Sequence, residues 1–111
     1  NDIKKGEISP VYLLGGDESY FIDQVVNYCE NTILDESEKA FNLDVFYGME
    51  VDPVKVQAIC REFPMMANRR LVIIKEGHKT RDLDKLDSYI LNPSQTTVLI
   101  IAMKGKKFDL R

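Results

Sequence analysis

Two adjacent glycines, Gly15 and Gly16, follow the apolar run 11–14 and precede apolar residues at helical spacing. This order predicts a strand, a glycine turn and a helix. Such a turn directs backbone N–H groups and the positive end of a helix dipole toward an anion, which suits the phosphates of a nucleotide. A working phosphate loop reads G-x-x-x-x-G-K-[ST], because its lysine neutralises phosphate charge and its hydroxyl binds magnesium.

The residues after these glycines lack both of those groups. Counted from the first glycine, the lysine position holds Phe21 and the hydroxyl position holds Ile22. Asp17 and Glu18 would also place two negative charges where the phosphates should lie. The dinucleotide-binding pattern G-x-G-x-x-G is missing as well. The sequence therefore predicts a degenerate phosphate loop over residues 15–18 that binds no nucleotide and no other cofactor.

Other candidate catalytic residues are few. His78 is the only histidine and lies beside a predicted strand end, where a solvated loop residue is favoured over a catalytic base. Three aspartates on one predicted helix are more typical of its solvent-facing side than of a metal site; they are Asp82, Asp84 and Asp87. A small basic cluster after the last apolar run favours a solvated terminal segment over a phosphate contact; it comprises Lys104, Lys106 and Lys107. No catalytic residue and no metal site are predicted.

The segment before the third apolar run has an unusual composition. Phe63 and Pro64 should end an amphipathic helix, and Met65 and Met66 then occupy a short connection where polar turn residues would be usual. Two long apolar side chains in such a position need a partner. That partner is either the core of the domain itself or a groove on another protein, since methionine adapts its shape and recurs on protein-binding surfaces. The residues alone favour the core.

The composition indicates one cytoplasmic domain. A chain of 111 residues suffices for a single core. Its 15 Lys plus Arg against 18 Asp plus Glu give a net charge of -3, the opposite of the basic balance of a small DNA-binding domain. The longest apolar run, 98–103, is too short to cross a bilayer, and no signal peptide is recognisable. Cys29 and Cys60 fall on apolar faces of separate predicted helices, so we expect both to be reduced core thiols.

Strands and helices are expected to alternate along the whole chain. Asp52 and Pro53 are a good helix start, because Asp caps free N–H groups and Pro has none to leave unpaired. Asp44 within an apolar strand suits a sheet edge. The order strand-helix-strand-helix-strand-helix-strand predicts an α/β domain over residues 1–111, with a parallel sheet between helices. The expected strands are 11–14, 43–47, 71–74 and 97–102; the expected helices cover 21–33, 52–63 and 83–91.

Several segments, in this order and at this spacing, resemble the N-terminal domain of the DNA polymerase III delta subunit. They are residues 11–23, 41–46, 63–73, and Asn92-Pro93 before 97–101. The resemblance implies a three-layer, P-loop NTPase-like domain of the AAA+ clamp-loader group, with sheet order 5-1-4-3-2 and no ATPase activity. It also implies a longer subunit, whose lid and collar domains are absent here and contact the other loader subunits.

The resemblance further implies a role in DNA replication. In this family the domain binds the ring-shaped sliding clamp, the beta subunit, and helps to open it for loading onto primed DNA, so that DNA is contacted only indirectly. The holoenzyme of the family is a DNA-directed DNA polymerase. A large apolar pair in the position of Met65 and Met66, with Phe63 beside it, enters a pocket on the clamp; some relatives carry Leu-Phe there. The alternative is a small α/β domain that binds a phosphate or a nucleotide.

Overall fold

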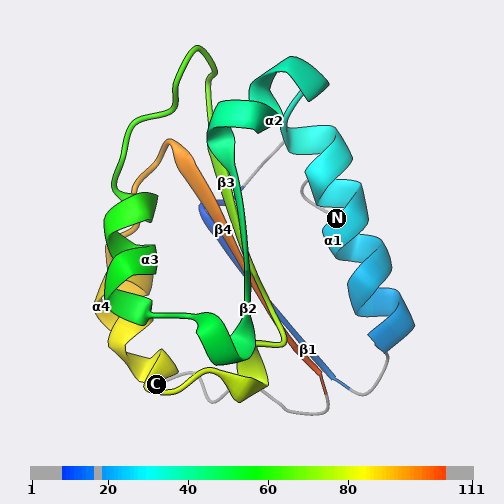
Figure 1. Cartoon of the computed structure of the whole chain (residues 1–111), viewed down its shortest axis with the longest axis vertical. Helices are drawn as coiled ribbons and strands as arrows, with labels where there is room; N and C mark the ends of the chain where they lie inside the picture. Colours follow the sequence, from blue (N-terminus) through cyan, green and yellow to red (C-terminus); the bar gives the residue numbers. More distant parts are fainter. Residues whose placement is uncertain (1–8, 17–18, 105–111) are drawn as a thin grey trace.

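The computed structural model describes residues 9–16 and 19–104. Its centre is a four-stranded parallel sheet in the order β1-β4-β3-β2 (Figure 1). This is the order expected for these four strands from the resemblance. The strands are β1 (Val11–Gly16), β2 (Leu43–Tyr47), β3 (Arg70–Lys75) and β4 (Thr97–Lys104).

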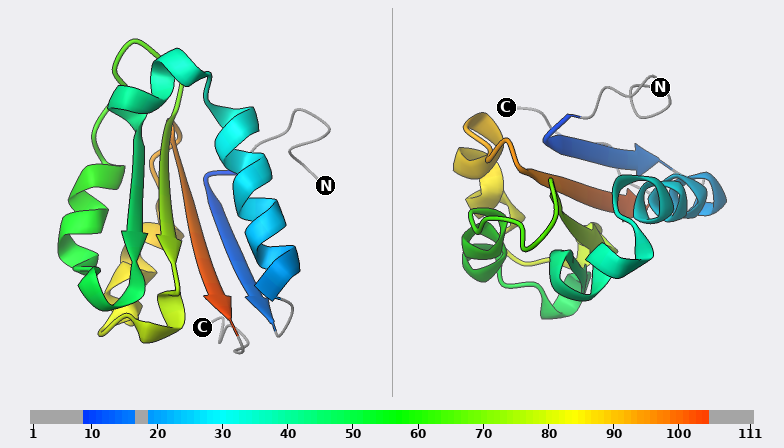
Figure 2. Two further views of the ribbon diagram at one scale, coloured as in Figure 1. Left: turned by 45° about the vertical axis from the view of Figure 1, so that its right-hand side comes forward. Right: turned by 90° about the horizontal axis from the view of Figure 1, so that it is seen from above.

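Helices cover both faces of the sheet, as predicted. Figure 1 and the view from above in Figure 2 show α1 on one side and α3 and α4 on the other. The helices are α1 (Ser19–Ile33), α2 (Glu36–Asn42), α3 (Pro53–Cys60) and α4 (Asp87–Leu91), with 3-10 turns η1 (Gly48–Glu50), η2 (Gly77–Lys79) and η3 (Leu83–Leu86).

The alternation of side chains in the central strands produces two hydrophobic cores. In β3, Leu71 and Ile73 pack in the core beneath α1, while Val72 and Ile74 pack in the core beneath α3 and α4. All four are fully buried. This agrees with a β-branched strand that is apolar on both faces. Cys29 and Cys60 are free thiols, one in each core, as predicted.

The two edge strands differ in how their edges are managed. On β2, Asp44 pairs with Arg70 of the neighbouring strand, which fits the predicted edge position. Among the described residues, β1 pairs with β4 alone, so one side of its backbone has no strand beside it. The sequence led us to expect that residues 104–111 or self-association would cover this edge; residues 105–111 lie outside the described part of the chain.

Several predicted elements differ in length from those observed. The strand β1 continues through Gly15 and Gly16, where Gly16 has a φ of 131°, a conformation that favours glycine. Helix α3 starts at Pro53 as predicted, with the side chain of Asp52 accepting from the N–H of Val54, but it ends at Cys60 instead of near Pro64. Pro64 disfavours helical geometry at Phe63, and the helix ends before it reaches that position. The predicted helix 83–91 is a 3-10 turn followed by the short α4.

Helix α2 was not predicted from the sequence. It spans seven residues and begins after Asp35, whose backbone N–H donates to Oε1 of Glu38 at 2.8 Å. This contact from Glu38 back to the cap residue is typical of a capping box. An Asp followed three residues later by a Glu was the sequence signal that could have revealed the helix. The last residue of α2, Asn42, is fully buried.

Candidate functional site

The parallel sheet separates two candidate sites. Because all four strands run in the same direction, α2 and the segment 61–69 meet at their amino ends, the upper end of Figure 1. The strand end at Gly16, which belongs to the predicted phosphate loop, lies at the opposite, carboxyl end. A ligand at one end therefore has no direct contact with the other.

The Met pair lies on the surface. Met66 is 95% exposed, Met65 55% and Phe63 83%. The core-packing interpretation that the residues alone favoured for the two methionines is therefore wrong for Met66, and Met65 is only partly buried. Phe63 was expected to complete the apolar stripe of a helix. It instead follows the end of α3, and its side chain is mostly exposed to solvent. Whether these side chains contact a clamp stays a prediction.

A further exposed aromatic side chain, Phe41, belongs to the same end of the molecule. It is 60% exposed and lies in the last turn of α2. Its neighbour Asn42 is hydrogen-bonded to Met65, so the end of α2 lies directly against the segment that carries the Met pair (Figures 1 and 2). We name Phe41, Phe63, Met65 and Met66 together the apolar end. Phe41 was missed because α2 was not predicted.

The buried side chain of Asn42 ties this segment to the domain. Its Oδ1 accepts from the backbone N–H of Met65 at 2.7 Å, and its Nδ2 donates to the carbonyl oxygen of Met65 at 2.7 Å. The same Nδ2 donates to the carbonyl oxygen of Glu38 at 3.0 Å. Both faces of the amide are thus satisfied although the residue is fully buried. Nothing in the local sequence indicated this role.

Arg70 follows the segment 61–69 and forms two ion pairs. Its Nη1 lies 2.9 Å from Oδ2 of Asp44 on β2, and its Nη2 lies 3.4 Å from Oε1 of Glu62, which precedes Phe63. The arginine side chain is 7% exposed. Solvent and salt therefore screen its ion pair with Asp44 less than they screen a pair on the surface. Its Nε has no hydrogen-bond partner within the described part of the chain. The guanidinium group of Arg70 thus connects the two ends of the segment, since Glu62 lies at its start and Arg70 itself follows its last residue.

The two thiols are poor nucleophiles. Burial raises the pKa of Cys60 from 9.0 to about 12, and burial with the nearby Glu30 carboxylate raises the pKa of Cys29 to about 11. Because the thiolate is the reactive species, neither side chain is suited to covalent chemistry near neutral pH. Tyr89, which lies beside Cys60, also has its pKa raised by burial, to about 12. These groups belong to the core.

The carboxyl end of the sheet offers little to a phosphate. Gly15 and Gly16 pair with β4 as part of β1, so these two residues do not form a wrapping loop; Asp17 and Glu18 lie outside the described residues. The predicted lysine and hydroxyl positions, Phe21 and Ile22, are in α1. Phe21 is exposed and Ile22 is in the core.

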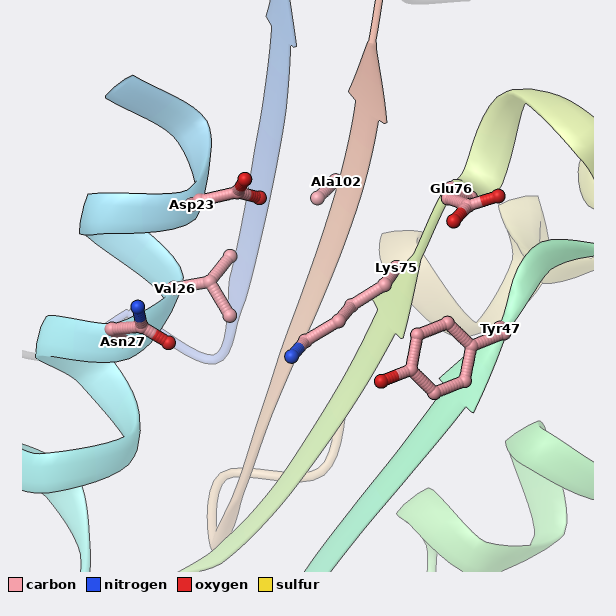
Figure 3. A pocket seen from close by; sticks show the side chains of 7 residues that line it. All are labelled: Asp23, Val26, Asn27, Tyr47, Lys75, Glu76 and Ala102. Atoms are coloured by element: carbon pink, nitrogen blue, oxygen red, sulfur yellow. The ribbon is translucent and has the colours of Figure 1, made fainter. Parts of the chain in front are cut away.

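A polar hollow of about 310 Å³ lies between α1 and the carboxyl ends of β2, β3 and β4 (Figure 3). Lys75 extends into it, with its Nζ 3.7 Å from Oε1 of Glu30 and 5.8 Å from the ring centre of Tyr47. The carboxylates of Asp23 and Glu76 also line it. One lysine that already contacts a carboxylate, with two further acids around it, does not suit a phosphate.

The remaining candidate residues form no site. His78 lies half-buried in η2, while Asp82, Asp84 and Asp87 are exposed around η3 and the start of α4, as predicted. The described residues contain no cluster of three metal-ligating side chains and no helix long and apolar enough to span a bilayer. Lys106 and Lys107 lie outside the described residues, and Lys104 ends β4.

Comparisons with known proteins agree with the fold and with the resemblance. The family model for the DNA polymerase III delta subunit matches residues 12–111. DNA polymerase III subunit delta of Bacillus subtilis (strain 168) is 39% identical over 121 aligned positions, which cover 98% of this chain and 34% of that protein. A solved structure of the Bacillus subtilis DNA clamp loader delta protein matches with a TM-score of 0.87 and 35% identity, over 99% of this chain and 35% of that one. The chain spans about a third of the length of these relatives. It belongs to the DNA polymerase III delta subunit family.

Proposed function

We propose that this domain is the clamp-binding part of a replication clamp loader. Its apolar end, with Phe63, Met65 and Met66 at the centre, docks on the sliding clamp and helps to open it. The observation that carries the proposal is the exposure of Met66, which is 95% accessible in a segment whose backbone is anchored at Met65. A flexible apolar side chain held out from a fixed backbone suits insertion into an apolar pocket.

The family supports this role and its wider setting. The relatives are named as delta subunits and as a clamp loader protein. On this basis the domain is an AAA+-like unit with a degenerate phosphate loop and no ATPase activity, working in the cytoplasm. Further domains of the subunit would contact the other loader subunits, and DNA would be reached through the clamp. The acidic balance of the chain agrees with the lack of a direct DNA contact.

The alternative of a phosphate-binding domain has less support. The hollow beside Lys75 has acidic neighbours, and the two glycines of the predicted loop are paired in β1. At the other end of the sheet, the four exposed apolar side chains of the apolar end lie on or beside the segment that Asn42 anchors at Met65. Scattered apolar side chains on a surface need no explanation, but a group concentrated around one anchored segment marks an interaction site.

The proposal is tested by direct binding. The sliding clamp of the same organism is immobilised, and the complete protein is titrated over it with surface plasmon resonance, in the presence and absence of ATP. We expect saturable binding that ATP does not change. If the clamp shows no saturable binding, the docking role is wrong. If affinity depends on ATP, the assignment of a non-functional phosphate loop is wrong.

A further inference from the structure

The side chain of Asn42 fixes the backbone that displays the Met pair. We propose that Asn42 is a positioning residue for clamp docking, which presets the conformation of segment 63–68 before the clamp is met. The inference rests on the proposed function, and it adds a residue from α2 that no exposed apolar contact would reveal. Asn42 touches the Met65 backbone and leaves the clamp contacts to the apolar side chains.

The hydrogen bonds define a single orientation of the amide. With Oδ1 facing the Met65 N–H and Nδ2 facing the carbonyl oxygens of Met65 and Glu38, every polar group has a partner. The flipped amide would place an oxygen against two carbonyls and an NH₂ group against an N–H. The amide therefore accepts from and donates to one residue, as a neighbouring strand would, and it holds that residue at two points.

Met66, the residue after Met65, has a backbone conformation that needs the support of these hydrogen bonds. Met66 has a φ of 55°, in the left-handed region that a residue with a Cβ seldom adopts. Backbone of this kind persists only where its surroundings determine it. Within segment 63–68, the described hydrogen bonds that involve main-chain atoms are the two between Asn42 and Met65, one donated by Asn42 and one by the Met65 N–H. The left-handed turn that points Met66 away from the domain thus depends on one side chain of α2.

Loss of the amide should release the segment without unfolding the sheet. A loop that samples several conformations binds more weakly, because only the competent fraction docks and the rest must be ordered on binding. In Asn42→Ala, the two bonds to Met65 are gone while the strands and their register remain. The variant should therefore show a local loss of order at the Met pair together with a loss of clamp affinity.

Hydrogen exchange tests the structural half of the proposal without the clamp. In the complete protein, the Met65 amide should exchange more slowly than the amides of Ala67 and Asn68 in the same segment. In Asn42→Ala it should exchange as fast as they do, while the β3 amides stay protected. Equal rates at Met65, Ala67 and Asn68 in the unmodified protein would overturn the proposal, and that measurement needs no variant to fold.

Clamp affinity tests the functional half. We expect Asn42→Ala to weaken binding about tenfold or more, mainly through slower association. The matched control is Thr80→Val, which removes a 3.0 Å side-chain bond to the carbonyl of Gly48 at the opposite end of the sheet and should leave affinity unchanged. Equal losses in both variants would reduce Asn42 to a general stabilising residue and overturn its positioning role.

The two proposals fail in different ways. If Met66→Ala binds the clamp as tightly as the unmodified protein, the proposed docking site is wrong. If Met66→Ala loses affinity and Asn42→Ala does not, the docking site stands and only the positioning role of Asn42 is wrong.

Discussion

Changing Met65 and Met66 together to alanine is the sharpest test of the apolar end. Full burial of a methionine side chain contributes about 1.5–3 kcal/mol. Scaled by their exposed fractions of 55% and 95%, and less what alanine retains, the pair should contribute about 2–4 kcal/mol to the proposed docking. This corresponds to a Kd that rises about 30- to 1000-fold.

The same change should have little effect on folding. Met66 makes almost no contact with the domain, and Met65 buries less than half of its surface. The free energy of unfolding should therefore fall by about 1 kcal/mol, equivalent to a decrease in Tm of about 5 °C. Two methionines packed in the core would instead cost about 2–5 kcal/mol each and unfold much of the sample.

The assay compares affinity and Tm in one set of proteins. The matched control is Met49→Ala, because Met49 is 85% exposed in η1, at the carboxyl end of the sheet. We expect the control to bind the immobilised clamp at full strength and the double variant to bind weakly, with circular dichroism spectra that agree. A double variant that keeps its affinity, or that melts far below the control, would refute the reasoning.

Three further predictions concern other parts of the domain. Fluorescent ATP titrated to about millimolar concentration should show no saturable binding at the Gly15–Gly16 end of β1; a site there would contradict the degenerate loop. Since the pKa values of Cys29 and Cys60 rise from 9.0 to about 11 and about 12, the unfolded chain loses these protons first. Urea denaturation should thus show a stability that is full below about pH 9 and falls as the pH rises toward about 12, less steeply when both are alanine. Because no strand lies on the outer side of β1 among the described residues, we expect the 111-residue chain to self-associate unless residues 104–111 cover this edge. Light scattering that shows a strict monomer at high concentration, with that edge open in a crystal structure, would count against it.

The strands could be predicted because their signals are local. The run 71–74 is β-branched and apolar on both faces, and only a strand between two layers of helices buries both. The start of α3 was equally clear. Asp52 accepts a hydrogen bond from the N–H of Val54, and Pro53 has no N–H to leave unpaired. In these places one short segment contains the whole physical cause.

The parts of the site that were missed depend on residues far apart in the chain. Asn42 and Met65 are 23 positions apart, and Asp44 and Arg70 are 26 positions apart. Neither pair has a local pattern, because each forms only when β2 and β3 lie side by side. Phe63 was assigned to the wrong environment for a related reason. Its helical spacing continues the stripe of α3, but the backbone leaves the helix before reaching it.

The left-handed backbone at Met66 sets two opposite demands on that position. For folding alone the best residues are glycine, which has no Cβ, and asparagine, whose side chain can hydrogen-bond locally; other residues with a Cβ pay about 1 kcal/mol or more there. For filling a pocket the best residues are long, unbranched and apolar, and a β-branched side chain serves neither demand well. Stability and docking therefore favour different residues at this position. A library selected for thermal stability should be enriched in glycine or asparagine, and a library selected for docking in long, unbranched apolar residues. If the proposed docking role holds, methionine at this position favours docking at some expense of stability.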